Sequence, residues 1–287
     1  MATPICALCG DSHSRLRFQK QDRDFLECQR CGLVWIDPLP SPADVADRYS
    51  DAYSAGEYAA FARARGTRDL ISEHRLEIVR NQVKPGRWLD VGCATGSFVA
   101  AAVAQGCAAE GLDASREAVE ITRERGLTAH HGRVEDFTPP QLYDVITAFD
   151  VLEHAIDPRA FVKRLGGWLG SRGSLVLTLP DVRSVYATLL MRKHWFYFWP
   201  DEHLFYFDPE TIARLLEEEG FEVQKLTRAY KPLSLEYAAK NLEVFNQTLG
   251  RVASATVGLL PRRLRERPFR FYLGEMLVLA RRVAGTA

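Results

Sequence analysis

The stretch that decides the fold is WLDVGCATGSF, residues 88–98. An apolar strand leads into an acidic residue, then a glycine-rich turn, and then an apolar segment that begins a helix near Thr95. Gly92 and Gly96 remove side chains where a ligand contacts backbone, and the helix start offers unpaired N–H groups to a carboxylate or phosphate. Asp90 adds an acceptor at the carboxyl end of the strand, where open parallel sheets bind ligands. This stretch therefore predicts a cradle for a small ligand.

The spacing of the glycines discriminates between ligands. A dinucleotide site requires G-x-G-x-x-G, whereas residues 92–97 read GCATGS and would crowd a pyrophosphate. The order Asp-x-Gly-x-x-x-Gly resembles the first motif of class I S-adenosylmethionine-dependent methyltransferases, in which the acid and the turn hold the amino-acid end of the cofactor. A second strand, over 108–112, ends in Asp113, the position at which such folds place an acid against the ribose hydroxyls.

Strands and helices alternate after residue 86, which predicts a parallel sheet with helices on both faces. The predicted fold class is α/β: a seven-stranded Rossmann-like methyltransferase sheet, mostly parallel, with the last strand antiparallel. The expected strands are 88–91, 108–113, 127–131, 145–149, 175–179, 221–227 and 275–282. Three helices are expected to start at Gly96, Ser115 and Asp157, and a fourth is expected to span 209–219.

The sequence predicts three parts. A zinc ribbon spans 1–40 and ends in the proline-rich segment DPLPSP. A helical lid or linker spans 41–85. The methyltransferase domain spans 86–287, with insertions at about 181–208 and 229–270.

The ribbon prediction comes from four cysteines. Two Cys-x2-Cys pairs are separated by eighteen residues, and each pair is followed by a glycine. This spacing is typical of a structural zinc site, and a protein with no export signal is not expected to form disulfides here. The predicted zinc ligands are Cys6, Cys9, Cys28 and Cys31.

Charge and hydrophobicity exclude several classes. Lysine plus arginine equals aspartate plus glutamate at 37 each, so no global field recruits nucleic acid or an anionic membrane, and any recruitment must be local. The hydrophobic content of 47% supports a sizeable core. No stretch reaches the roughly 20 apolar residues of a membrane span, so we expect a cytoplasmic protein. The sequence leaves its oligomeric state open.

The fourth predicted strand runs into FDVLEHAIDP, residues 149–158, at the same sheet edge as Asp90. This string resembles the corresponding motif of the ubiquinone-biosynthesis O-methyltransferases, and the resemblance covers roughly residues 70–228. It implies that Phe149 flanks the adenine or the sulfonium and that His154 faces the methyl acceptor. In those relatives a Glu-x-x-Glu-His group can hold a divalent ion, here Asp150, Glu153 and His154, so the resemblance also leaves a magnesium ion open. A helix-start histidine bonded to a neighbouring carboxylate is the alternative for His154.

A second candidate base lies in the aromatic insertion over residues 186–207, whose core, residues 194–207, reads HWFYFWPDEHLFYF. Related enzymes carry a histidine just before an apolar pair and a helix, which matches His203. Its aromatic neighbours are expected to wall an acceptor pocket, to cover it, to mediate an oligomer contact, or simply to be buried under the C-terminal insertion. His154 and His203 rank as near-equal candidates for removing the acceptor's proton.

The remaining cofactor-binding candidates are Cys93, Val134, Glu135 and Arg75. Many relatives carry an acid where this chain has Arg133, so the contact to the adenine amino group is expected from Glu135, Asp136 or the backbone.

The predicted function is methyl transfer from S-adenosylmethionine to an oxygen or nitrogen of a small acceptor such as a sugar or secondary metabolite. The arginine-rich segment PRRLRERPFR, residues 261–270, is either a contact for a phosphate-bearing acceptor or a solvated loop. Two rivals remain: an RNA base methyltransferase that grips its substrate with the ribbon, and a non-catalytic cofactor-binding module. A ribbon with balanced charge disfavours nucleic acid.

Overall fold

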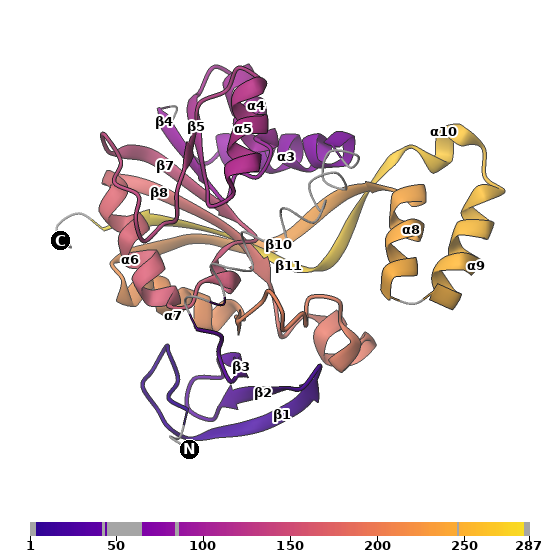
Figure 1. Ribbon diagram of the computed structural model, residues 1–287, viewed down its shortest axis with the longest axis horizontal. Coiled ribbons are helices and arrows are strands. Elements are labelled where there is room, and N and C mark those ends of the chain that lie inside the picture. The colour runs from indigo at the N-terminus through magenta and orange to yellow at the C-terminus, as the bar shows by residue number, and fades with distance from the viewer. Residues whose placement is uncertain (1–3, 42–43, 45–64, 84–85, 246, 284–287) are drawn as a thin grey trace.

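The computed structural model describes residues 4–41, 44, 65–83, 86–245 and 247–283 (Figure 1). Most of the predicted helical lid therefore lies outside the described residues. Its described part is helix α3 (Arg65–Arg80), which packs beside helix α4 (Ser97–Ala104). None of the described helices has the length and apolar character needed to cross a bilayer.

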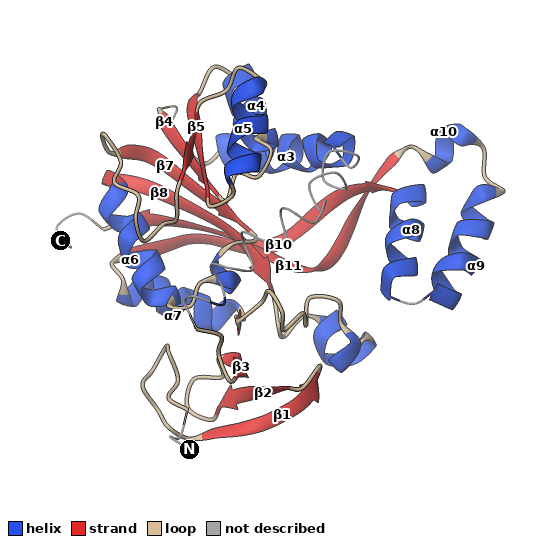
Figure 2. Cartoon of the chain, viewed as in Figure 1, coloured by secondary structure: helices blue, strands red, loops and turns tan. Residues whose placement is uncertain are grey.

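The main sheet has seven strands in the order β10-β11-β8-β7-β4-β5-β6 (Figure 2). β11 runs antiparallel to both of its neighbours, and the other pairings are parallel, so the predicted fold class is confirmed. The strands are β4 (Arg87–Val91), β5 (Ala108–Asp113), β6 (Ala129–His131), β7 (Tyr143–Phe149), β8 (Leu169–Pro180), β10 (Phe221–Ser234) and β11 (Pro268–Arg282).

Helices cover both faces of this sheet, and local sequence signals set where they begin. Ser115 caps α5 (Arg116–Glu124) by accepting a hydrogen bond from the Ala118 amide. Asp157 and Asp208 cap α6 (Pro158–Trp168) and α7 (Pro209–Glu218) in the same way, with proline at the first helical position of each. α3 and α4 contribute to one apolar core, and α6 and α7 contribute to the other. The strands between these two layers of helices are therefore buried on both faces.

A second, four-stranded sheet follows the order β1-β2-β3-β9. Its first three strands come from the N-terminal segment: β1 (Ser14–Lys20), β2 (Arg23–Cys28) and β3 (Val34–Asp37). The fourth, β9 (Phe205–Tyr206), belongs to the aromatic insertion, which also contains the short helices η2 (Tyr186–Leu190) and η3 (Arg192–His194). The insertion is thus tied to the N-terminal sheet by backbone pairing.

The C-terminal insertion differs from the prediction in its boundaries. β10 and β11 were expected to end at 227 and to start at 275, but their pairing extends, through a register shift between Ala229 and Tyr230, as far as Ser234 opposite Pro268. The two flanks of the insertion satisfy each other's backbone groups, a long-range pairing that no local pattern signals. The resulting two-stranded ribbon carries α8 (Leu235–Phe245), α9 (Gln247–Gly258) and α10 (Arg262–Arg265) away from the rest of the molecule (Figure 1).

Candidate functional site

The glycine-rich turn lies between β4 and α4, at the carboxyl edge of the sheet. Gly92 has φ +72°, and a Cβ there would come within 2.5 Å of the Val151 side chain. Gly96 also has a positive φ and precedes the first residue of α4. The backbone of this turn is thus exposed in a shape that side chains would block, as expected of a ligand cradle.

Asp113 holds this turn from the end of β5. Its Oδ2 accepts a hydrogen bond from the Ala94 amide at 2.8 Å, and its Oδ1 accepts one from the Ser115 amide at 2.8 Å. Ala94 itself has φ +47°, a left-handed backbone that side chains seldom adopt. A carboxylate offers about four acceptor positions, so Asp113 retains capacity for a ligand hydroxyl.

Asp90 is buried beside the turn and accepts a hydrogen bond from the Thr147 hydroxyl at 2.7 Å. Burial raises the pKa of Asp90 to about 7, against the lowering effects of Thr147 and Arg75. A carboxyl group held in this state gains most from a cationic ligand, because a nearby ammonium offsets the cost of burying the charge.

Asp150 follows β7 with a left-handed backbone, φ +58°. Its Oδ2 lies 2.6 Å from Nη2 of Arg75 and 3.6 Å from Nζ of Lys231, and its Oδ1 accepts a hydrogen bond from the Thr178 hydroxyl. Arg75 is also stacked over the Phe149 ring at 4.6 Å. The two cations hold the pKa of the Asp150 carboxyl well below its usual range despite burial. Asp150 thus combines a strained backbone with two cationic partners, a combination typical of functional sites.

Two members of this cluster, Lys231 and Glu275, carry no motif signal and were missed in the sequence, whereas Tyr197 is one of the aromatic neighbours of His203 considered there. Lys231 Nζ lies 2.7 Å from Glu275 Oε1 and donates a hydrogen bond to the Tyr197 hydroxyl at 3.0 Å. Burial raises the pKa of Glu275 to about 7, against the lowering effect of Lys231. Charged residues inside β10 and β11 were the only available hint.

His154 and His203 come together although they lie on different segments. His154 ends the short helix η1 (Leu152–His154), and its ring centroid lies 4.8 Å from that of His203. Nδ1 of His203 lies 2.8 Å from the Tyr197 carbonyl, so this nitrogen donates and Nε2 is left with its lone pair. Burial lowers the pKa of His154 to about 4 and that of His203 to about 3. Both imidazoles are therefore neutral proton acceptors near pH 7.

Glu153 completes this group. Its side chain is buried, and neither carboxyl oxygen has a hydrogen-bond partner among the described residues. Burial and the charge of Asp150 raise the pKa of Glu153 well above its usual value. Ligand atoms of Glu153, His154 and His203 all lie within 4.8 Å of one another. The three side chains thus form one largely buried cluster.

The magnesium set implied by the resemblance does not fit this geometry. Asp150, its first member, is engaged by Arg75 and Lys231. The donors that do converge are two imidazoles and one carboxylate, whereas magnesium prefers an all-oxygen shell.

The other predicted cofactor-binding residues differ in their burial and in their contacts. Phe149 meets Phe98 edge to face at 4.8 Å, and Cys93 is buried in the turn with its Sγ against Gly111. Val134 is buried, whereas Glu135 pairs with Arg133 at 3.3 Å.

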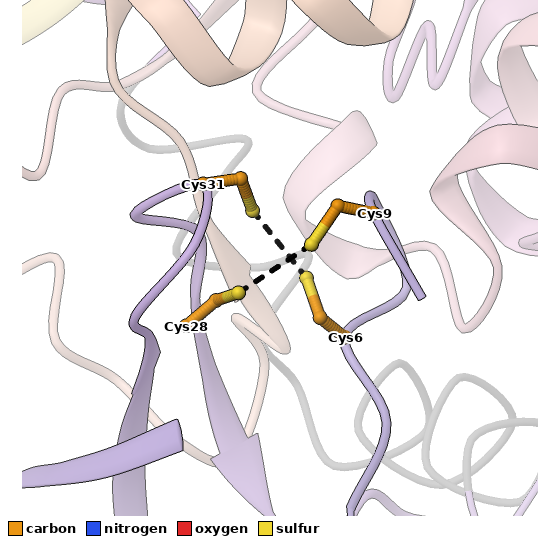
Figure 3. A group of neighbouring side chains, drawn as sticks. All are labelled: Cys6, Cys9, Cys28 and Cys31. Atoms are coloured by element: carbon orange, nitrogen blue, oxygen red, sulfur yellow. Dashed lines mark hydrogen bonds between the residues drawn. The ribbon is translucent and has the colours of Figure 1, made fainter. Parts of the chain in front are cut away.

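The four N-terminal cysteines converge on one point, from two turns that face each other (Figure 3). Sγ of Cys6 and Cys31 are 3.5 Å apart, as are those of Cys9 and Cys28, which is too far for disulfides. Four sulfurs at about 2.3 Å from a central zinc would be about 3.8 Å apart, so the cluster fits a tetrahedral zinc ion. The glycines after each pair, Gly10 and Gly32, have positive φ, as the turns require.

Part of the aromatic insertion is buried, on one side against β10 and β11 and on the other against the N-terminal sheet. Nε1 of Trp195 donates a hydrogen bond to the Leu273 carbonyl at 3.2 Å, and the Tyr197 hydroxyl meets Lys231. Phe198 contacts Phe18 and Phe25 edge to face at 4.8 and 5.5 Å. Lys20 donates a hydrogen bond to the Phe198 carbonyl at 2.6 Å. The N-terminal sheet thereby supports the segment that carries His203.

Comparisons with known proteins agree with this geometry. The family model described as "Methyltransferase domain" matches residues 61–226. The ubiquinone biosynthesis O-methyltransferase of Thiobacillus denitrificans is 29% identical over 168 residues, which are 52% of this chain and 70% of the relative. The mitochondrial ubiquinone biosynthesis O-methyltransferase of Schizosaccharomyces pombe is 26% identical over 190 residues, 58% of this chain and 69% of the relative.

Solved structures share the fold. An S-adenosylmethionine-dependent methyltransferase from Archaeoglobus fulgidus aligns with a TM-score of 0.52 at 17% identity, covering 78% of this chain and 99% of that one. The cofactor implied by the family fits the residues present, because Gly92 adopts a positive φ beside Val151 where a side chain would clash, and the buried Asp90 suits an ammonium. The family match over more than half of the sequence, set on this sheet and this turn, means that the chain belongs to the methyltransferase-domain family of class I S-adenosylmethionine-dependent enzymes.

Proposed function

We propose that this enzyme methylates an oxygen or nitrogen of a small-molecule acceptor, such as a sugar or another secondary metabolite, with His154 or His203 as the general base. The observation that carries the proposal is the convergence of two neutral, buried imidazoles with an unpartnered Glu153 at the cofactor edge. The similarity to ubiquinone biosynthesis O-methyltransferases supports an oxygen acceptor.

S-adenosylmethionine supplies a methyl carbon already activated by a positively charged sulfur, so the protein's work is alignment and proton removal. The turn at Gly92 and the acids Asp90 and Asp113 orient the donor. Arg75 pairs with Asp150 and lies over the Phe149 ring, so it would hold both side chains in place beside a bound donor. His203 Nε2 or His154 takes the acceptor's proton, and ionisation of Glu153 beside them would stabilise the imidazolium that forms.

Three contacts argue against the RNA alternative. Arg17 and Lys20 of β1, which a nucleic-acid grip would need, donate hydrogen bonds to the Val182 and Phe198 carbonyls at 3.4 and 2.6 Å. Arg15 is paired with Glu27 at 3.0 Å. The segment 261–270 belongs to the protruding ribbon and helices, so we do not assign it to the acceptor site (Figure 1).

The test separates binding from turnover. S-adenosylhomocysteine binding is measured by calorimetry for the wild type, His154→Ala, His203→Ala and the matched control His194→Ala, an exposed histidine of the same insertion. Turnover is followed as transfer of labelled methyl to a panel of phenols, amino sugars, nucleotide sugars and tRNA. We expect binding to change less than about twofold, and turnover on a small acceptor to fall about 10²- to 10⁴-fold for the residue that acts as base.

Three outcomes would contradict the proposal. Label on tRNA alone would favour the RNA alternative. Binding without turnover on any acceptor would favour a non-catalytic module. Turnover equal to that of His194→Ala in both variants would remove the histidines from the mechanism.

A further inference from the structure

The ribbon formed by β10 and β11 ends in a helical tip that the methyl-transfer site does not use. We call residues 247–270 the tip: it contains α9, α10 and the first residues of β11. In Figure 1 it is the part of the chain farthest from the main sheet on its side of the molecule. Such a projection can meet a flat surface before the rest of the protein does.

Helices α8 and α9 pack against each other without using the outward-facing apolar side chains of the tip. Gly250 is buried, and a Cβ there would come within 2.3 Å of the Glu243 backbone, so α8 and α9 pack as closely as backbones allow. The residues on the other side of α9 and in the following turn face outward. Leu259 is 87% exposed and Val252 is 60% exposed, and Leu264 and Phe269 are also exposed. Single exposed apolar side chains are common, but several grouped on one projection are typical of an interaction surface.

The tip also carries a strong excess of positive charge. It contains six arginines and a single acidic residue, Glu266, although the whole chain is neutral. Arg262 pairs with Glu266 at 2.7 Å on the outside of α10. Arg251, Arg263 and Arg267 are exposed as well. Arginines interleaved with exposed aliphatic side chains are the composition of segments that lie at a membrane interface.

We propose that the tip docks the enzyme on an anionic lipid bilayer, with Leu259 and Leu264 in the headgroup boundary and the arginines on lipid phosphates. Charge complementarity selects this occupant. A second copy would bring the same arginines against themselves in a twofold interface. A nucleic acid would pair with the arginines but would leave the leucines unused, and the tip has only one aromatic residue, Phe269, on which a base could stack.

The test is sedimentation of the full chain with vesicles. One set contains phosphatidylcholine alone and the other contains phosphatidylcholine and phosphatidylglycerol in about equal parts. We expect binding to the anionic set only, decreasing with added salt. The double variant Arg262→Glu/Arg263→Glu should lower the bound fraction at least tenfold, and Leu259→Asn should lower it severalfold at unchanged charge.

The matched control is Lys163→Glu/Arg164→Glu, which makes the same charge change on exposed residues of α6. It should bind vesicles like the wild type. All variants should keep the wild-type affinity for S-adenosylhomocysteine, which shows that they fold and separates this proposal from the proposed reaction.

Equal binding to both vesicle sets would overturn the proposal, as would equal losses in the tip and α6 double variants. A concentration-dependent dimer that Leu259→Asn dissociates, with no vesicle binding, would identify a second copy as the occupant instead. Binding to RNA with no vesicle binding would identify a nucleic acid.

Discussion

The rings of His154 and His203 meet edge to face, with centroids 4.8 Å apart and planes 88° apart. One ring follows β7 and the other precedes β9, so this contact joins the cofactor edge to the aromatic insertion. Burial lowers the pKa of both imidazoles, and each is further affected by its neighbours, Asp150 for His154 and His154 for His203. The pair should therefore make the protein sensitive to acid.

The first prediction concerns stability and pH. A histidine whose pKa is lowered by folding binds fewer protons in the native state, so stability is complete above about pH 6.5 and is lost as the pH falls toward 4. His203→Gln, which keeps a donor for the Tyr197 carbonyl, should lose about 3 kcal/mol less than the wild type between pH 7 and 4.5. Urea unfolding at the two pH values measures this. His194→Gln is the exposed control, and a loss equal to the wild type's in His203→Gln would contradict the burial argument.

Asp90→Asn should separate stability from cofactor binding. The pKa of Asp90 is about 7, so at pH 8 the native state holds a buried charge that asparagine removes, while the amide oxygen still accepts from Thr147. We expect unfolding free energy at pH 8 to be unchanged or higher, and S-adenosylhomocysteine affinity to fall at least tenfold because the ammonium loses its partner. Wild-type affinity should rise as the pH increases through about 7, and the variant's should not. Calorimetry across this range decides it.

Gly92→Ala and Gly126→Ala form a matched pair. Both positions have a positive φ, but a Cβ at Gly92 would lie 2.5 Å from Val151, whereas a Cβ at Gly126 meets open space. Gly126→Ala should cost about 1 to 2 kcal/mol from backbone strain alone. Gly92→Ala should cost more and should also weaken S-adenosylhomocysteine binding. Equal unfolding curves for the two variants would show that the turn at Gly92 yields without cost.

The zinc assignment predicts metal content and its effect on the distant histidine. The wild type should carry one equivalent of zinc, and Cys28→Ser should lose it and unfold the small sheet. Because β3 pairs with β9, turnover should fall as well, through His203. Cys107→Ser, a cysteine outside the cluster, is the control. Elemental analysis would also reveal a second equivalent if Glu153, His154 and His203 bind a metal ion. A metal-free protein with unchanged unfolding would contradict the assignment.

Local motifs predicted where Asp90, Gly92 and Asp113 lie in the fold, and their contact with the cofactor stays a prediction. Asp90, Gly92 and Asp113 each stand in a short pattern whose chemistry depends on neighbours in sequence, namely a strand end and a turn. The capping residues Asp157 and Asp208 likewise signal their helices locally. At these positions, the residues that interact in the fold are also close together in the sequence.

The acceptor side could not be predicted in the same way. Lys231 and Glu275 lie on strands that flank an insertion, and their meeting with Asp150 depends on the register of β10 and β11. β9 is two residues long, and its pairing with β3 has no periodic signal. Charged residues in a strand usually face solvent, so only the tertiary structure reveals that these are buried.

Lys231→Met should be among the most damaging single substitutions in the chain. It removes the cation that lies 2.7 Å from Glu275, whose side chain is fully buried, and leaves that carboxyl without a charged partner. We expect a loss of about 3 to 5 kcal/mol in unfolding free energy. The control Lys240→Met removes an exposed lysine paired with Glu236 and should cost less than about 0.5 kcal/mol. The double variant Lys231→Met/Glu275→Gln should recover part of the loss, because no buried charge is then left unpaired. A double variant that is destabilised by the sum of both single changes would mean that the ion pair is not what Lys231 contributes.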